Sequence, residues 1–198
     1  MSEIQIRLVE GDERAAALAV ERQVFLEEGF PYDYDRFDAQ SRVFGAFDEG
    51  RCIGAVRMVA QSPLSPPVLA DCEVWDRSTW ENLGYRFEEL ATQAVQKEYR
   101  KLMVGLDLVR TAYADARNRG VEVMALILEP DRAEFLNDVV HFACRQIGEI
   151  GYKDWDCAPY AHVLDEVEQK LASSDPSLYA WFTEQVDPDR LAAPRVSA

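Results

Sequence analysis

A basic cluster precedes a glycine in the stretch QKEYRKLMVG, residues 96–105, directly before a segment whose apolar residues have helical spacing. Where a strand ends at such a turn and a helix begins, backbone N–H groups and the helix dipole converge on an anion. An ordinary solvated helix start is the alternative, so this motif alone leaves anion binding open. The residues of this candidate anion site, called the basic turn below, are Lys97, Arg100, Lys101, Met103, Val104 and Gly105.

A second group of charged residues lies upstream. Arg57 interrupts the apolar run IGAVRMVA, so it either faces inward as a paired cation or is the outward residue of an alternating strand. Asp35 and Asp38 belong to the acidic stretch YDYDRFD, which is either an exposed loop or a site for an ammonium group. We expect Arg57 to pair with Asp35 or Asp38.

Several common chemistries are not supported by the sequence. Its four cysteines never approach C-x-x-C spacing, and only two histidines could join them in a metal site, so we expect buried, reduced thiols and no metal. No G-x-S-x-G elbow, P-loop or G-x-G-x-x-G is present. The residues concerned are Cys52, Cys72, Cys144, Cys157, His141 and His162.

Composition restricts the class of protein further. The chain has 198 residues, 48% of them hydrophobic, which suits one substantial core. Its net charge of −15 would repel a nucleic-acid backbone or an anionic membrane. The longest apolar run, VMALIL, is far below the roughly 20 residues of a membrane span, and the N-terminal residues have no signal-peptide pattern. We therefore expect a cytoplasmic protein without nucleic-acid partners or membrane insertion.

The elements that must position these residues follow from periodicity. Residues 4–10 alternate as a strand, and the next segment has Ala17, Val20 and Val24 at helical spacing. Residues 42–60 form two β-rich runs around the turn DEG, which indicates a hairpin. Residues 61–84 contain three prolines and little periodicity, as in an irregular excursion bordering a site.

The second half of the chain also predicts alternating strands and helices. YRFEELATQAVQ is typical of a strand, and a helix is expected over residues 105–119, ended by Gly120. Its expected apolar stripe is Leu106, Val109, Tyr113 and Ala116.

VEVMALILE predicts a buried strand, DRAEFLNDVVHFACRQIG a helix opened by Asp131, and GYKDWDCAPYAHVLDEV a strand pair leading into a final helix. The last dozen residues are an expected disordered tail, which gives one domain over residues 1–186 and a tail over residues 187–198. This order predicts an α/β (α+β) fold with a mixed sheet and helices on both faces.

The stretch EYRKLMVG resembles the pyrophosphate-binding R/Q-x-x-G-x-G/A signature of GNAT N-acyltransferases, with Arg100 and Gly105 in register. RQVFLEEGF, DRFD, GRCIGAVRMV, PLSPPVLAD and EELATQAV resemble successive blocks of acyl-homoserine-lactone (autoinducer) synthases and long-chain N-acyl amino acid synthases. The resemblance implies a single-domain GNAT fold with a sheet splayed near the basic turn. It also implies an acyl carrier protein thioester or acyl-CoA as donor, with no tightly bound cofactor, and an amine as acceptor.

Family positions map onto individual residues. Asp35 and Asp38 match a D-x-x-D pair, Arg57 the arginine that ends the third strand, Glu89 the glutamate of E-x-x-R, and Phe25 the aromatic of the first helix. The sequence departs from the family pattern at four positions: Met103 replaces the first glycine, Thr92 the arginine of E-x-x-R, Phe30 a tryptophan, and Glu21 an arginine, with Arg22 one position away.

The chemistry of amide formation from a thioester assigns roles to some of these residues. The reaction needs a neutral amine, donors for the oxyanion and a proton for the departing thiolate. Glu89 could accept the amine proton or be a solvated strand carboxylate. Tyr152 and Tyr160 could donate a proton to the sulfur or be ordinary core or surface aromatics.

Three hypotheses follow. The first is transfer of a medium or long acyl chain to an amino-acid-like amine, with Phe25, Phe30 and Thr92 binding substrate. The second is short-chain acetyl transfer from CoA to a cationic amine. The third is a GNAT-fold protein that binds an acyl thioester without turnover. We place acyl carrier protein slightly ahead of CoA as donor, because its single phosphodiester demands less of a turn in which Met103 replaces glycine.

Overall fold

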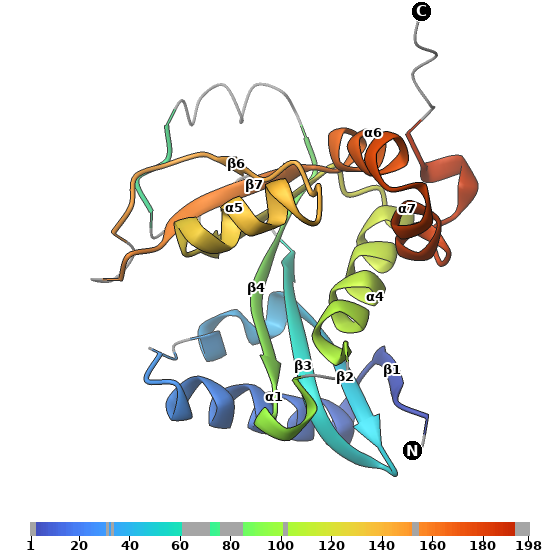
Figure 1. Ribbon diagram of the computed structural model, residues 1–198. Helices are drawn as coiled ribbons and strands as arrows, with labels where there is room; N and C mark the ends of the chain where they lie inside the picture. Colours follow the sequence, from blue (N-terminus) through green and yellow to red (C-terminus); the bar gives the residue numbers. More distant parts are fainter. Residues whose placement is uncertain are drawn as a thin grey trace, which may run out of the picture. The chain divides into compact units, whose positions relative to one another are not determined.

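The computed structural model describes residues 3–30, 32, 34–60, 72–75, 85–100, 103–151 and 155–192. The chain divides into two compact units. The first unit comprises Met1–Ala60 and Leu90–Tyr113, and the second comprises Gln61–Glu89 and Ala114–Ala198. Seven strands form one sheet in the order β1-β2-β3-β4-β5-β7-β6, and this sheet mixes parallel and antiparallel pairs (Figure 1).

The first unit begins with an antiparallel meander of β1 (Gln5–Leu8), β2 (Ser41–Asp48) and β3 (Arg51–Ala60). The β2–β3 hairpin turns through Glu49 and Gly50, whose φ angles of 49° and 82° are both positive. Two positive φ values match the right-handed twist of the flanking strands in a tight hairpin. The hairpin expected in residues 42–60 is confirmed.

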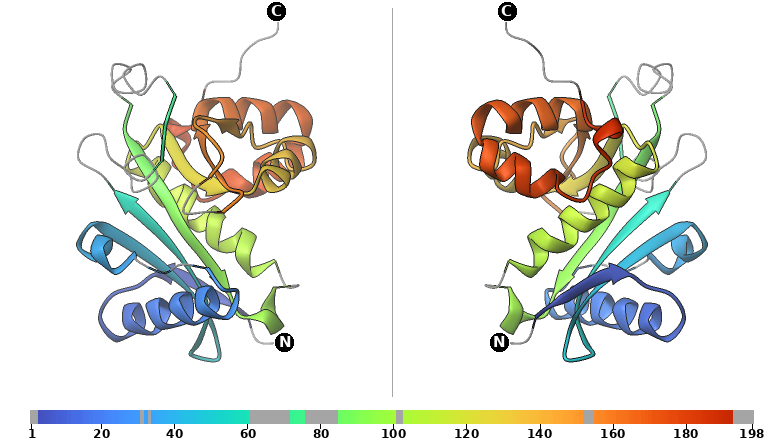
Figure 2. Two further views of the ribbon diagram at one scale, coloured as in Figure 1. Left: turned by 90° about the vertical axis from the view of Figure 1, so that its left-hand side faces the viewer. Right: turned by 90° about the vertical axis from the view of Figure 1, so that its right-hand side faces the viewer.

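Helix α1 (Gly11–Glu27) covers one face of these strands, and the first turns of α4 (Val104–Asn118) cover the other (Figure 2). Ala17, Val20 and Val24 of α1 are buried in a cluster with residues of β2 and β3, as their spacing predicted. On the α4 side, a β-carbon at Gly54 would lie 3.2 Å from Leu108 Cδ1, so the glycine permits close packing of helix on strand. The expectation of helices on both faces is confirmed.

Strand β4 (Phe87–Val95) belongs partly to each unit. Its parallel register with β5 (Val123–Leu128) contains only Phe87, Glu88 and Glu89, opposite residues 123–125. The pairing of β4 with β5 therefore ends at Glu89, and the rest of β4, which leads to the basic turn, is not paired with β5. Of the stripe expected on α4, Tyr113 and Ala116 are buried, whereas Leu106 and Val109 are only half-buried. The other buried positions of α4 are Val104, Leu108, Ala112, Ala114 and Arg117.

The second unit contains β5, α5 (Pro130–Asp138), β6 (Arg145–Gln146), β7 (Ala158–Val163), α6 (Leu164–Ser174) and α7 (Pro176–Thr183). The long helix expected from residue 131 was wrong in extent, because α5 starts at Pro130 and ends at Asp138. His141 and Ala143 then have φ angles of 61° and 47°, which a helix cannot accommodate, and the chain enters β6. Of the strand pair expected in residues 151–167, the described residues contain the strand β7, and its partner β6 comes instead from the segment expected to be helical.

Part of the expected tail is folded. Pro188–Arg190 form a short 3-10 helix, η3, whose Asp187 cap accepts the N–H of Asp189 at 3.0 Å. The Ala192 N–H donates to Glu168 Oε2 at 2.6 Å. Regular structure therefore continues beyond residue 186, and Ala192 contacts α6; residues 193–198 lie outside the described ranges.

The described parts of the chain contain no helix long and apolar enough to cross a membrane. Over the same ranges, no three His, Cys, Asp or Glu side chains are grouped as metal ligands. Cys52, Cys144 and Cys157 are buried free thiols, whereas Cys72 is half-buried.

Candidate active site

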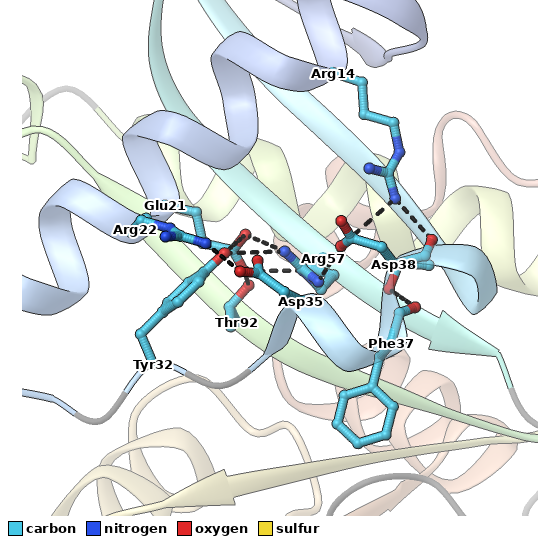
Figure 3. Close-up of polar contacts among 10 residues, drawn as sticks. Arg14, Glu21, Arg22, Tyr32, Asp35, Phe37, Asp38, Arg57 and Thr92 are labelled. Carbon is cyan, nitrogen blue, oxygen red and sulfur yellow. Dashed lines mark hydrogen bonds and ion pairs between the residues drawn. The ribbon is translucent and has the colours of Figure 1, made fainter.

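Arg57 is the centre of a buried ionic network in the first unit (Figure 3). Its side chain is fully buried, and its Nε and Nη2 donate to Oε1 and Oε2 of Glu21 at 3.0 and 2.7 Å. Its Nη1 donates to Asp38 Oδ1 at 2.8 Å. Burial acts to lower the pKa of Arg57, but the hydrogen bonds and charge of Glu21 outweigh it and raise that pKa. The pairing expected between Arg57 and Asp38 is confirmed.

Glu21 is the member of the network that sequence reasoning missed as a partner. It follows Val20 and lies four residues after Ala17 and three before Val24, on the buried stripe of α1. Its side chain is fully buried. A glutamate on an apolar stripe needs a buried cation, and Arg57 inside an apolar strand needs a buried anion, so the two irregularities in the patterns explain each other.

Thr92 and Tyr32 complete this arrangement, which we call the Arg57 network: Glu21, Tyr32, Asp38, Arg57 and Thr92. The Thr92 hydroxyl hydrogen-bonds to Glu21 Oε1, and the Tyr32 hydroxyl lies 3.2 Å from Glu21 Oε2 and 3.1 Å from Arg57 Nη2. Burial, followed by the charge of Glu21, raises the pKa of Tyr32, so its hydroxyl keeps its proton at neutral pH. Thr92 and Glu21, the two positions where the resemblance implied arginines, therefore contact each other.

Asp35 takes a different partner from Asp38. It forms an ion pair with Arg22, and both side chains are about half exposed. Asp35 and Asp38 lie in the 3-10 helix η1 (Tyr34–Gln40), which precedes β2. Asp38 Oδ1 is also 4.0 Å from Arg14 Nη2, so each carboxylate of the D-x-x-D pair already has an arginine partner.

An open groove of about 530 Å³ runs between α1 and η1, and we call it the α1 groove. The wall from α1 is apolar except for Arg22, while the opposite wall carries a phenol and two carboxylates. Its lining residues are Ala15, Leu18, Ala19, Arg22, Tyr32, Asp35 and Asp38. The groove therefore shares Tyr32 and Asp38 with the Arg57 network.

The two expected aromatic substrate contacts lie beside this groove. The rings of Phe25 and Phe30 have centroids 5.7 Å apart, and Phe25 lies edge-on to Tyr32 at 6.1 Å. Both phenylalanines are half-buried. They form an aromatic cluster at the end of α1, where a role in substrate binding remains a prediction.

The charged side chains of the basic turn differ in their surroundings. Arg100 donates from Nε to the Val95 carbonyl at 3.0 Å and pairs through Nη1 with Glu28 Oε1 at 2.8 Å. Lys97 is exposed at the start of the 3-10 helix η2 (Lys97–Tyr99). Lys101 lies outside the described residues. Much of the positive charge expected from Arg100 is thus offset by the carboxylate that ends α1.

Met103 has a backbone conformation that glycine adopts more readily than other residues. Its φ angle is 62°, in the left-handed region, and its side chain is 58% exposed. Its carbonyl accepts the N–H of Asp107 at 3.0 Å, so the turn leads directly into α4 at the buried Val104. Next to it, the Gly105 carbonyl accepts from Gln93 Nε2 at 2.6 Å. The backbone of the turn is therefore compatible with an anion site, and the Met103 side chain is what differs.

Glu89 is buried on β4, with 1% of its surface exposed, opposite Ala125 of β5. Its neighbour Glu88 points the other way and pairs with Arg119 at the end of α4, with Nη2 and Oε2 2.7 Å apart. The two adjacent carboxylates therefore differ in their surroundings, and the role of Glu89 as a base stays a prediction.

The expected proton donors are only partly described. Tyr160 is buried on β7, and burial raises the pKa of its hydroxyl. Tyr152 lies outside the described residues. The role of Tyr160 as an acid stays a prediction.

Comparison with known proteins agrees with this architecture. The model of the acetyltransferase (GNAT) family matches residues 12–135. FeeM, an N-acyl amino acid synthase from uncultured soil microbes, superposes with a TM-score of 0.72 at 16% identity, over 86% of this chain and 96% of that chain.

Acetyltransferases of known structure are also similar. Naa50 from Arabidopsis thaliana, in complex with a bisubstrate analogue, has a TM-score of 0.55 at 15% identity, over 80% of this chain and 97% of its own. A GNAT acetyltransferase from Elizabethkingia anophelis with acetyl-CoA bound has a TM-score of 0.52 at 13% identity, over 81% of this chain and 98% of its own. A comparison with curated proteins gives no match. At these identities the structural similarities establish the fold, and the expected GNAT fold is confirmed.

Proposed function

Because the chain belongs to the acetyltransferase (GNAT) family and is an N-acyltransferase, we propose that it transfers a medium or long acyl chain from a thioester to the amine of an amino-acid-like acceptor. The amine nitrogen attacks the thioester carbonyl, the C–S bond breaks, and the products are an amide and a thiol. The attacking nitrogen loses one proton and the departing sulfur gains one.

The observation that carries this proposal is the Arg57 network beside the α1 groove. Arg57 fixes Asp38, one carboxylate of the D-x-x-D pair, at the edge of a groove that also contains Asp35. Two carboxylates in an open groove can hold the ammonium form of an amine acceptor, and the apolar α1 wall can accept a side chain. Similarity to an N-acyl amino acid synthase over most of both chains supports the same class of acceptor.

Glu89 is our proposed base. A buried carboxylate on a central strand can take a proton from an amine, directly or through water, at the stage when the amine attacks. Its burial on β4, three residues before Thr92 in the sequence, supports this role.

The proposed donor is a thioester of acyl carrier protein or of CoA, with the pantetheine arm near the basic turn. The exposed Met103 side chain stands where a diphosphate would approach a glycine backbone, which favours a donor with a single phosphate. Asp107 lies in the first turn of α4, and burial raises the pKa of its carboxyl group.

The test is a matrix of donors and acceptors with the purified full chain. Acyl carrier protein and CoA thioesters of two, ten and sixteen carbons would each be offered with amino acids, polyamines and a peptide N-terminus, and amides detected by mass spectrometry. Long-chain amides of amino acids support the proposal. Exclusive acetylation of polyamines would instead identify a short-chain acetyltransferase, and absence of turnover with every pair would indicate a thioester-binding protein.

A further inference from the structure

The Arg22–Asp35 pair in the α1 groove is accessible to a ligand. The two side chains are 52% and 54% exposed, and both line the groove. An ion pair this exposed contributes little to stability, because both charges are well solvated when separated. A ligand that offers a carboxylate to Arg22 and an ammonium to Asp35 can therefore replace each partner at small cost.

Asp38 provides a second acceptor for such an ammonium. Its side chain is 41% exposed, and its contacts with Arg57 and Arg14 both use Oδ1. Its Oδ2 has no partner among the described residues. Because the buried Arg57 fixes Asp38 from behind, this oxygen can accept a hydrogen bond without a large loss of side-chain freedom.

The charges of the groove are balanced, which selects against a simple cation. Arg22 faces Asp35, and the carboxylates of Glu21 and Asp38 are matched by Arg57 and Arg14, so a polyamine gains little net attraction here. Arg22 also lies over the ring of Tyr32, 5.0 Å from its centroid, which orients the guanidinium. An oriented guanidinium binds a carboxylate through two parallel hydrogen bonds.

We propose that Arg22 determines acceptor specificity by binding the carboxylate of an α-amino acid, while Asp35 and Asp38 hold its ammonium group and Leu18 and Ala19 contact its side chain. This inference rests on the proposed N-acyltransferase function and adds the residue that distinguishes a free amino acid from other amines. The Arg22–Asp35 pair opens when the acceptor binds. The basic turn contacts the C-terminal end of α1, where Glu28 pairs with Arg100. Glu28 lies six residues after Arg22, which is about 9 Å along a helix.

Binding of the acceptor can be tested without turnover. Calorimetry would compare phenylalanine, phenylalanine amide and phenethylamine with the wild type, Arg22→Met and a matched control, Arg7→Met. Arg7 also forms an exposed ion pair, with Glu13, outside the groove. We expect Arg22→Met to weaken binding of phenylalanine by about 10- to 100-fold, as for loss of a charged hydrogen bond, and to change binding of the two carboxylate-free amines by less than about 3-fold. Arg7→Met should bind all three as the wild type does.

Acyl transfer to the same three acceptors separates this inference from the proposed function. The inference is supported if kcat/KM falls for phenylalanine alone in Arg22→Met and is partly restored in Arg22→Lys, with unchanged thermal unfolding. Equal use or equal binding of phenylalanine and its amide by the wild type would overturn it while leaving acyl transfer intact. Carboxylate-dependent binding through Arg22 without any amide product would support the site and reject the enzymatic function.

Discussion

At the scale of single residues, Arg57 shows how a buried cation is tolerated. It contacts the fully buried Glu21 through two nitrogens and the half-exposed Asp38 through a third. Removing one partner leaves the other charge in a site from which water is excluded, which is more costly than removing both. The two carboxylates therefore differ in importance, since only Glu21 lacks access to solvent.

We predict that Arg57→Met lowers the free energy of unfolding by about 3–5 kcal/mol, because it leaves Glu21 buried and unpaired. Glu21→Gln should be similarly costly, and the double variant should lose clearly less than the sum of the two. Urea unfolding of the three variants measures this coupling, with Arg7→Met as an exposed-pair control expected to change stability by less than about 1 kcal/mol. Strict additivity would mean that the two residues are not energetic partners.

Glu89 and Glu88 allow a matched comparison of adjacent carboxylates. We predict that Glu89→Gln lowers kcat for acyl transfer by about 100-fold or more with little change in melting temperature, as expected for loss of a general base. Glu88→Gln instead removes one of the two carboxylate partners of Arg119, so it should lower stability and leave kcat within a few-fold. Full activity of a folded Glu89→Gln protein would assign that carboxylate a structural role.

At the scale of elements, the strands and helices of the first unit were predictable because each pattern is local. The DEG turn, the stripe of Ala17, Val20 and Val24, and the alternation of β1 are all visible within a few residues. The end of α5 at Asp138 was not predictable, because the positive φ angles that follow it at His141 and Ala143 are not signalled by those side chains. The role of Glu21 was equally hidden, since it depends on a contact with β3, 36 residues away.

The basic turn allows a prediction about its backbone. Met103 at φ 62° carries the strain of a left-handed conformation, about 1 kcal/mol, which glycine avoids at a comparable entropic cost. We predict that Met103→Gly leaves stability within about 1 kcal/mol of the wild type and tightens binding of CoA, measured by calorimetry. Met103→Ala, which retains a β-carbon, is the control and should tighten binding less. Unchanged CoA affinity in both variants would show that the side chain does not obstruct the turn.

At the scale of the whole molecule, acidification changes folding stability through the net charge and through a buried histidine, and the two effects have opposite signs. The chain carries a net charge of −15 at pH 7, so acidification toward its pI of about 4.5 relieves self-repulsion. His162 on β7 opposes this trend. It is buried, its Nδ1 lies 2.8 Å from the Phe142 carbonyl, and burial lowers its pKa to about 4.

Because the unfolded chain protonates His162 near pH 6.5 and the folded chain only near 4, its contribution to stability is complete above pH 6.5 and is lost as pH falls toward 4. The loss amounts to about 3 kcal/mol. We predict that His162→Asn has a shallower fall of unfolding free energy between pH 6.5 and 4, measured in high salt to screen the net charge. His141→Asn, at a position that tolerates a left-handed residue, should keep the wild-type slope. A wild-type slope in His162→Asn would assign the acid sensitivity to other groups.

Net charge also bears on the donor. Acyl carrier protein is acidic, so a protein with a net charge of −15 repels it except near a local cluster of positive charge. At physiological salt, exposed charges act only over about 8–10 Å. Around the basic turn, Arg100 is offset by Glu28 and Arg51 by Glu98, which leaves Lys97 as the described cation with the most local effect. We predict that Lys97→Glu lowers kcat/KM for a carrier-bound acyl thioester by about 10-fold or more at low salt, and less at 0.5 M salt.

The same substitution should change kcat/KM for an acyl-pantetheine thioester without the carrier by less than about 2-fold, since no protein surface is then recognised. Glu98→Lys frees Arg51 from its partner and adds a cation, so it should speed transfer from the carrier at low salt. Equal losses with both donors in Lys97→Glu would assign the lysine to phosphate binding. Efficient use of acyl-CoA beside rejection of every carrier thioester would make CoA the donor, and the obstruction expected from Met103 would then have to be small.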